Sequence, residues 1–242
     1  MADAAPAPNR LLNPAELSRS DFREILGRLD EMTARDDITY LHPGKRWEYP
    51  WALERAGLKP GEKVLDAGCG ASIFPAYLAD QGYRTTACDL EEFPAGLQYL
   101  HGGGVDYGRA DLTRMPYAAD VFDAVFCISV IEHLPREAMD AAMNEFHRIL
   151  RPGGRLLLTT DYYEDASAPL WYEGPGPAFD VDWNVFDRPR LEAVVLNADG
   201  FEVMGDIDLS ADWELIRPRM LAFHGYPYTS VGVALAKSPL NR

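Results

Sequence analysis

The sequence predicts an α/β domain in which helices cover both faces of a largely parallel β-sheet. Between residues 63 and 160, short apolar segments alternate five times with segments of helical periodicity. Strands of parallel sheets are buried on both faces, and the continuously apolar run at 124–128 fits such an environment. A glycine-rich turn follows the first apolar segment, and parallel sheets bind their ligands at the carboxyl ends of the strands.

The expected elements follow from apolar periodicity and from residues that end helices. Gly57 ends the second helix, and Pro-Gly-Gly at 152–154 breaks a long helix before the fifth strand. Asp187 caps a further helix that has Pro189 in its first turn. Strands are expected at 63–66, 83–88, 105–111, 121–128, 155–160, 201–209 and 230–236. Helices are expected at 14–35, 45–56, 73–81, 91–100 and 137–150.

Composition divides the chain into three parts. Residues 1–12, rich in Ala and Pro, are expected to be a disordered tail, 13–57 an N-terminal helical lid, and 58–242 the α/β domain. Two insertions, 161–187 after strand five and 210–228, interrupt the α/β alternation, and the first is too long for an ordinary connection. Their aromatic side chains either line a ligand-binding site or pack the insertions onto the sheet. The candidates for substrate binding are Tyr162, Tyr163, Trp171, Trp183 and Tyr226.

The formal net charge of −15 arises from 38 acidic and 23 basic residues. Such a surface repels nucleic acid phosphates and anionic lipid headgroups, so we expect neither as a partner. The acidity either serves solubility or attracts a cationic substrate such as an amine. The three cysteines form no CxxC pair, which argues against disulfides and a zinc site. Because the sequence shows neither a signal-peptide pattern nor a long apolar run, we expect a cytoplasmic protein, either a monomer or a homodimer.

The first chemical motif is the turn Val-Leu-Asp-Ala-Gly-Cys-Gly at 64–70. Gly68 and Gly70 allow the backbone to turn sharply and a ligand to approach closely. The carboxylate of Asp66 can accept hydrogen bonds from an ammonium group or from amides of the loop, and it would repel a pyrophosphate. Ile73 stands where a dinucleotide-binding fingerprint has its third glycine, which disfavours a nicotinamide dehydrogenase.

Acidic residues also end the next two strands. Asp89 lies about twenty residues after the glycine turn, where an acid can hold ribose hydroxyls at the switch point of the sheet. Asp111 can accept from the exocyclic amine of adenine, although acids at such positions also cap helices and turns. Leu90 and Leu112 could enclose a flat base between them.

Five segments in this order resemble the class I S-adenosylmethionine-dependent methyltransferases. They are VLDAGCG, CDL, ADLTRMPY, FDAVFCISVIEHL and FHRILRPGGRLLLTT. The resemblance is closest to the group that includes the ubiquinone-pathway O-methyltransferases and many sugar and natural-product methyltransferases. It covers residues 60 to 160, and more loosely 187 to 236. It implies a Rossmann-like sheet of seven strands, the last antiparallel, and S-adenosylmethionine as the cofactor.

The resemblance also implies functions for individual residues. Asp66, Gly68 and Gly70 would line the methionine part of the cofactor, and Arg46 would either hold its carboxylate or be an ordinary surface charge. A glutamate that binds a metal in some relatives is replaced by Ser129, so we expect no metal. The remaining cofactor contacts would come from Asp89, Leu90, Asp111, Leu112, Ile128 and Ser129.

The expected activity is methyl transfer to a small-molecule acceptor, in particular to a hydroxyl of a sugar or natural product. A hydroxyl must lose its proton, and His133 is the first candidate for the base because the pKa of histidine lies near neutrality. His133 could instead cap the following helix, and His224 is a second candidate base. The alternatives are N-methylation of a small amine, methylation of a protein, and a non-catalytic scaffold that binds the cofactor.

Overall fold

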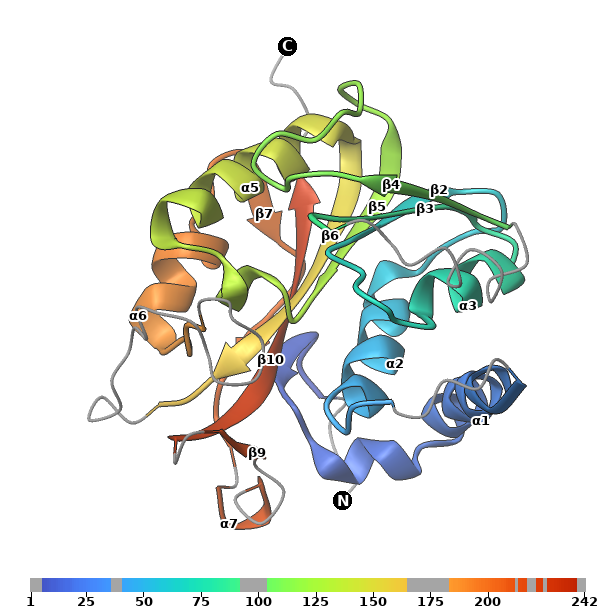
Figure 1. The fold of residues 1–242 in the computed structure, drawn as a ribbon. Helices are drawn as coiled ribbons and strands as arrows, with labels where there is room; N and C mark the ends of the chain where they lie inside the picture. The colour runs from blue at the N-terminus through green and yellow to red at the C-terminus, as the bar shows by residue number, and fades with distance from the viewer. Residues whose placement is uncertain are drawn as a thin grey trace.

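In the computed structural model, the chain is built around one mixed β-sheet (Figure 1). The structure describes residues 6–35, 41–91, 104–164, 183–211, 213–216, 221–223 and 226–238. The strand order is β4-β3-β2-β5-β6-β10-β1-β8, and β7 and β9 also pair with β10. The strands are β1 (Asn9–Leu11), β2 (Lys63–Ala67), β3 (Arg84–Asp89), β4 (Val105–Arg109), β5 (Phe122–Ile128), β6 (Leu150–Tyr162), β7 (Phe201–Val203), β8 (Ile207–Asp208), β9 (Leu221–Phe223) and β10 (Tyr226–Lys237).

The central strands β4, β3, β2, β5 and β6 run parallel, and β10 is antiparallel to β6. Each of the seven expected strands has a counterpart in this sheet. The expected number of seven is nevertheless wrong, because β1 and β9 also join the sheet and the strand expected at 201–209 is divided into β7 and β8. β1 and β9 are only three residues long, too short to show the alternation by which a strand is recognised in a sequence.

The helices agree with the expected pattern over the described residues. They are α1 (Ser20–Arg35), α2 (Lys45–Ala56), α3 (Phe74–Asp80), α5 (Arg136–Ile149), α6 (Arg188–Leu191) and α7 (Trp213–Ile216). Gly57 ends α2 in the left-handed conformation at φ 51°, and the Asp187 carboxylate caps α6 by accepting from the backbone N–H of Arg190. Two 3-10 turns, Pro14–Ser18 and Ile131–His133, complete the description, and α6 continues into a π-helical turn at Glu192–Leu196. The helix expected at 91–100 lies outside the described residues except for Glu91.

The core has two parts, one on each face of the sheet. On one face, side chains of α1, α2 and α3 pack against Val64, Phe126 and Leu157. On the other face, side chains of α5 and α6 pack against Val125 and Leu158. Neighbouring residues of β5 and β6 therefore contact opposite layers, as the pleat of a strand requires.

Within residues 13–57, where the sequence predicts a helical lid, α2 contributes side chains to this core. Trp47 and Trp51 of α2 are 0% exposed, and their rings are stacked with centroids 5.7 Å apart. A Cβ atom placed on Gly232 of β10 would lie 2.5 Å from Trp51 Cε2. The helix therefore contacts the backbone of the sheet directly, which only a glycine at position 232 permits.

The expectation of a disordered tail at 1–12 is also wrong where the structure describes it. Asn9–Leu11 form β1, which lies between β10 and β8. The Asn9 side chain accepts from the N–H of Ala234 at 2.7 Å and donates to the carbonyls of Met204 at 3.2 Å and Asp206 at 3.1 Å. One buried amide thus satisfies backbone groups of two separate segments, a contact that local composition cannot reveal.

Replacing Gly232 by Ala should lower the free energy of unfolding by about 1–3 kcal/mol, because the packed indole of Trp51 leaves no room for a methyl group. Gly27→Ala is the matched control. Gly27 lies in α1, where an added methyl group would have no atom within 4 Å, so this variant should be more stable by about 0.5–1 kcal/mol. Urea denaturation measures both. Equal stability of Gly232→Ala and wild type would contradict the close contact.

Candidate functional site

The carboxyl ends of β2, β3 and β4 lie side by side at one edge of the sheet. Asp66 pairs with Ala87 in the parallel ladder of β2 and β3, and Asp89 pairs with Arg109 in that of β3 and β4. Asp66 and Asp89 therefore reach the same edge, and Asp111 follows shortly after β4. Parallel sheets bind ligands at this edge.

The glycine turn after β2 is fixed to the end of β3. The N–H groups of Gly68 and Cys69 both donate to the carbonyl of Cys88, at 2.8 and 3.0 Å. Gly68 has φ +78°, and a Cβ on it would lie 2.5 Å from Val130 Cγ1. Gly70 has φ +51° with nothing within 4 Å of a Cβ, so the loop borders open space there. The first glycine is required for packing, and the second leaves room for a ligand.

Asp66 is a buried carboxyl group at this edge, with 3% of its surface exposed. Burial raises the pKa of Asp66 to about 7, and the nearby ammonium group of Lys45 opposes this rise. A cationic group placed against Asp66 would favour its ionised form. The site therefore suits a ligand that carries an ammonium group.

Asp89 holds the glycine turn from the end of β3. Its Oδ2 accepts from the N–H of Gly70 at 2.8 Å, and its Oδ1 accepts from Glu91 at 3.3 Å. Each carboxylate oxygen can accept a second hydrogen bond, so both remain available to hydroxyl groups of a ligand. Leu90, next in the chain, is a large apolar side chain that is 59% exposed, as a contact for a flat base would be in the absence of the base.

The expected adenine-edge residues lie just beyond β4. Asp111 accepts from the backbone N–H of Thr113 at 2.8 Å and from its hydroxyl at 2.7 Å, which is the turn-capping role that acids at such positions often have. These bonds hold the pKa of Asp111 below its ordinary value. Leu112 is buried in the core on the α5 side.

Arg46 does not point toward the strand ends. Its guanidinium forms a bidentate pair with Asp30 of α1, at 2.7 and 2.9 Å, and thus has the surface role that the sequence left open. The neighbouring Lys45 lies at the site instead. Its Nζ donates to the carbonyl of Ile128 at the end of β5 and pairs with Glu48 Oε2, both at 2.9 Å. Lys45 is therefore a cation of the site that sequence reasoning missed.

Ser129 follows β5 in an unusual conformation with φ 52°. Its N–H donates to the carbonyl and the hydroxyl of Thr159, at 3.1 and 3.0 Å, and its own hydroxyl donates to Glu48 Oε1 at 2.9 Å. Ile128 before it is 6% exposed and belongs to the α2-side core. Ser129 is thus held by hydrogen bonds on both sides, and Glu48 is another residue that the sequence analysis did not identify.

Four ionisable side chains near the ends of β5 and β6 influence one another electrostatically, and we call them the acidic cluster: Lys45, Glu48, Glu132 and Asp161. The three acids are 2%, 0% and 8% exposed, respectively. Burial raises the pKa of Glu132 to about 8 and raises that of Asp161 well above its ordinary value. Asp161 Oδ2 accepts from the indole N–H of Trp183 at 2.7 Å.

The structure separates the expected acceptor-binding aromatics. Tyr162 is 0% exposed and lies in the core on the α5 side, whereas Asp161 faces the α2 side, because successive strand residues face opposite layers. Tyr163 packs edge-to-face on Trp213 at 5.8 Å, and Trp183 on Tyr228 at 5.2 Å. Trp171 lies outside the described residues, as does the side chain of Tyr226.

The structure describes one of the two histidines named as candidate bases, His133. His133 is half-buried and ends the 3-10 turn after β5, where its N–H donates to the carbonyl of Val130 at 2.9 Å. It therefore lies directly beside Glu132 in the chain, at the carboxyl edge of the sheet. His224 lies outside the described residues.

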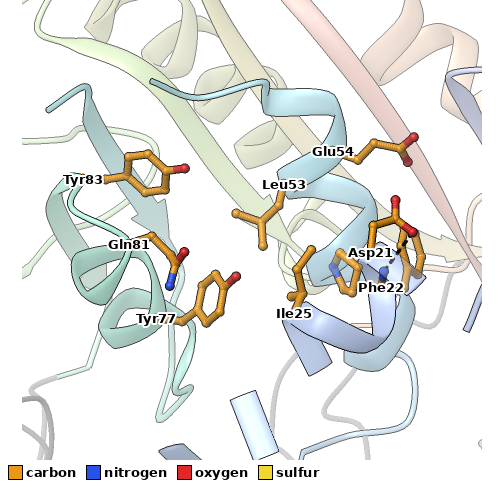
Figure 2. Close-up of a pocket in the computed structure, with 9 residues that line it drawn as sticks. Asp21, Phe22, Ile25, Leu53, Glu54, Tyr77, Gln81 and Tyr83 are labelled. Atoms are coloured by element: carbon orange, nitrogen blue, oxygen red, sulfur yellow. Dashed lines mark hydrogen bonds between the residues drawn. The ribbon is translucent and has the colours of Figure 1, made fainter. Parts of the chain in front are cut away.

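A separate surface pocket lies between α1, α2 and α3. Figure 2 shows Ile25 and Leu53 on one side and Tyr77, Gln81 and Tyr83 on the other. Its carboxylates are already engaged, because Asp21 and Glu54 both pair with Arg19. It contains none of the expected site residues.

Comparisons with known proteins identify the central part of the chain. Residues 65–158 match a family described as a methyltransferase domain. A ubiquinone biosynthesis O-methyltransferase of Pseudomonas aeruginosa is 37% identical over 125 residues, which cover 50% of this chain and 53% of the relative. One of Aromatoleum aromaticum is 33% identical over 157 residues, covering 63% and 64%. The chain spans about half the length of the first of these curated relatives.

Solved structures match over more of the chain. The 1,6-didemethyltoxoflavin-N1-methyltransferase of Burkholderia thailandensis, solved with its substrate and S-adenosylhomocysteine, has a TM-score of 0.62 at 23% identity over 97% of this chain and 93% of its own. The cyclase SpnF has a TM-score of 0.60 at 17% identity over 88% and 95%. At these identities the likeness shows the fold alone.

Together the family match and these relatives confirm that the central part of the chain resembles a methyltransferase domain, and the solved structures share its fold. Among the helices that the structure describes, none has the length and apolarity to cross a membrane.

Replacing Glu132 by Gln should stabilise the protein increasingly as the pH rises. In the folded protein the Glu132 carboxyl keeps its proton up to about pH 8, whereas its ordinary pKa is 4.5. Between these two pH values the unfolded chain releases the proton and the folded protein does not, so the free energy of unfolding of the wild type falls as the pH rises from 4.5 to 8. The difference in free energy of unfolding between Glu132→Gln and wild type should grow by about 1–3 kcal/mol from pH 5 to pH 8, or roughly 2–4 °C in Tm per kcal/mol.

Thermal unfolding across this pH range measures the effect. Glu137→Gln, on the exposed first turn of α5, is the control and should show no such growth. A constant difference for Glu132→Gln would show that the carboxyl is ionised in the folded protein.

Proposed function

We propose that this chain, whose residues 65–158 match the methyltransferase domain, transfers the methyl group of S-adenosylmethionine to a hydroxyl of a small molecule. The observation that carries this proposal is the strand-end arrangement of Asp66, the glycine turn and Asp89. It joins a buried acid, an open loop and a second acid with free acceptor capacity at one edge of the sheet. The relatives named as ubiquinone biosynthesis O-methyltransferases support a hydroxyl as the acceptor.

The residues present fit the cofactor. Asp66 would bind the ammonium group of its methionine part, and Asp89 would accept hydrogen bonds from the ribose hydroxyls. Leu90, exposed beside Asp89, would contact adenine, and Gly70 borders the space that the loop leaves open. Bound S-adenosylmethionine supplies a methyl group already activated by the sulfonium charge.

The chain itself must then position the acceptor and remove its proton. Alignment of the hydroxyl with the methyl group can supply much of the acceleration, because it converts an encounter of two molecules into a reaction within one complex. His133, at the edge of the sheet beside the acidic cluster, is the proposed base. A neutral imidazole can take the hydroxyl proton near neutral pH.

N-methylation of a small molecule is the second candidate. It is favoured by the formal net charge of −15, because an acidic surface attracts a cationic substrate such as an amine. The two candidates differ in their need for a base, since a neutral amine attacks through its own lone pair. Transfer from S-adenosylmethionine to matched phenols and anilines, followed by mass spectrometry of the products, distinguishes them.

Replacing Asp89 by Asn should weaken S-adenosylhomocysteine binding about tenfold or more, because hydrogen bonds to a charged group contribute about 1.5–3 kcal/mol. Titration calorimetry gives the Kd. The control is Asp199→Asn, an exposed acid near the start of β7, which should bind as wild type does. An unchanged Kd in folded Asp89→Asn would remove the ribose assignment.

The affinity for S-adenosylhomocysteine should fall as the pH drops below 7. Asp66 has a pKa of about 7 in the free protein, and only its ionised form can pair with the ligand's ammonium group. Linkage then predicts a loss approaching tenfold per pH unit below 7, and a plateau above it. Asp66→Asn should bind weakly at every pH without this dependence, whereas Asp89→Asn should keep the dependence. A pH-independent Kd in wild type would refute the pairing.

A further inference from the structure

The acidic cluster occupies the carboxyl ends of β5 and β6, on the side of the sheet covered by α2. Glu132 follows β5, Asp161 is near the end of β6, and Glu48 comes from the first turn of α2. Asp161 lies opposite Ser230 in the ladder of β6 and β10, and the Ser230 hydroxyl donates to Glu48 Oε1 at 2.6 Å. The cluster is therefore built by four elements around one place beside the glycine turn.

The cluster contains more negative groups than positive ones. Lys45 is its one cation, and Lys45 is already paired with Glu48 at 2.9 Å. The charges of Lys45 and His133 favour ionisation of Glu132 and Asp161, respectively, but burial outweighs them and raises the pKa of both acids. Buried carboxylates are unfavourable unless they are well paired, so the free protein retains protons on them. A ligand with a positive charge would allow both groups to release their protons and pair with it.

The Glu132 carboxyl group is poorly satisfied. It is 0% exposed and has no hydrogen bond of good geometry, although the nearby Thr160 hydroxyl favours its ionised form. Its backbone, in contrast, is firmly held, because its carbonyl accepts from the N–H and the side-chain amide of Asn184, at 2.8 and 2.9 Å. Buried polar groups are rarely left without partners, and exceptions in native structures commonly mark a missing ligand, ion or water.

Aromatic rings flank Asp161. The indole N–H of Trp183 donates to Asp161, and the Trp183 ring packs edge-to-face on Tyr228 at 5.2 Å. Trp183 is 7% exposed, and Tyr228 is half-buried. Faces of Trp and Tyr attract organic cations, most strongly when water is excluded. Acid and rings together thus favour a cation that carries carbon groups.

We infer that Glu132 and Asp161 bind a protonated amine of the methyl acceptor. This inference rests on the proposed function and names the substrate class of the same site. The ammonium group supplies the missing charge, and its N–H groups satisfy both oxygens of Glu132. A nitrogen held as ammonium has no lone pair, so it anchors the acceptor while a hydroxyl elsewhere on the same molecule receives the methyl group. The acceptor is thus a hydroxy compound that carries an amine, such as an amino sugar or a phenolic amine.

The geometry favours an organic cation over a metal ion. A metal requires several ligands that converge on one point, and among the described residues no three acidic, histidine or cysteine side chains do so. An ammonium group needs only one or two acceptors within hydrogen-bond distance and tolerates an aromatic wall.

The test uses two matched pairs of probes: tyramine with 4-ethylphenol, and glucosamine with glucose. Within each pair the hydroxyl groups are comparable, and one member carries an ammonium group. Titration calorimetry on the protein saturated with S-adenosylhomocysteine should show that the amine of at least one pair binds about tenfold or more tightly than its partner. Glu132→Gln and Asp161→Asn should each reduce this preference to about threefold or less, while Glu137→Gln retains it.

The inference is overturned if neither pair shows the preference, if all four probes fail to bind, or if the preference survives in both variants. Competition by magnesium chloride alone, with no effect of the amines, would assign the cluster to a metal and would also overturn it. Binding of S-adenosylhomocysteine is measured first on each variant and should equal that of wild type. If wild type does not bind it, the proposed function fails, and the amine preference is still measured on the free protein.

Discussion

The buried carboxylate of Glu48 connects α2 to the end of β5 and to β10. Its Oε1 accepts from the hydroxyls of Ser129, after β5, and Ser230, in β10, while its Oε2 pairs with Lys45. Burial alone opposes its ionisation, yet Lys45 and the two serine hydroxyls hold the pKa of Glu48 below its ordinary value. Because these partners come from three separate segments, one side chain sets how closely the helix approaches the strand ends.

The conformation of Ser129 depends on this interaction. A positive φ is uncommon for a residue other than glycine, and it persists only where the surroundings enforce it. Thr159 holds the backbone of Ser129 from one side, and Glu48 holds its hydroxyl from the other. The turn directs the chain into the segment Ile131–His133, so the positions of Glu132 and His133 follow from it. The acidic cluster is thus a consequence of how β5 ends.

Local patterns in the sequence were sufficient for the central strands, the glycine turn and the acids that end β2 and β3, because each depends on neighbouring residues. They were not sufficient where a position depends on which face of a helix or strand a residue points from. Lys45 and Arg46 are adjacent in α2 and point about 100° apart. The whole stretch from Trp47 to Ala52 is buried, so polarity could not show which of the two basic residues faces the sheet. Asp161 and Tyr162 present the same problem in a strand, where one position decides between the site and the opposite core.

The strand β1 shows what a contact between distant parts of the chain requires of folding. The side chain of Asn9 is bonded to the backbone of Ala234, 225 positions further along. During synthesis, the parallel strands β2 to β6 can pair as they emerge, but the partners of β1 in the described sheet, β8 and β10, are made only after residue 206. Until then Leu11, which is 4% exposed in the folded protein, remains exposed to water or in transient contacts. Closure of this edge is therefore a late, non-local step, and such steps are the slow and aggregation-prone part of folding in mixed sheets.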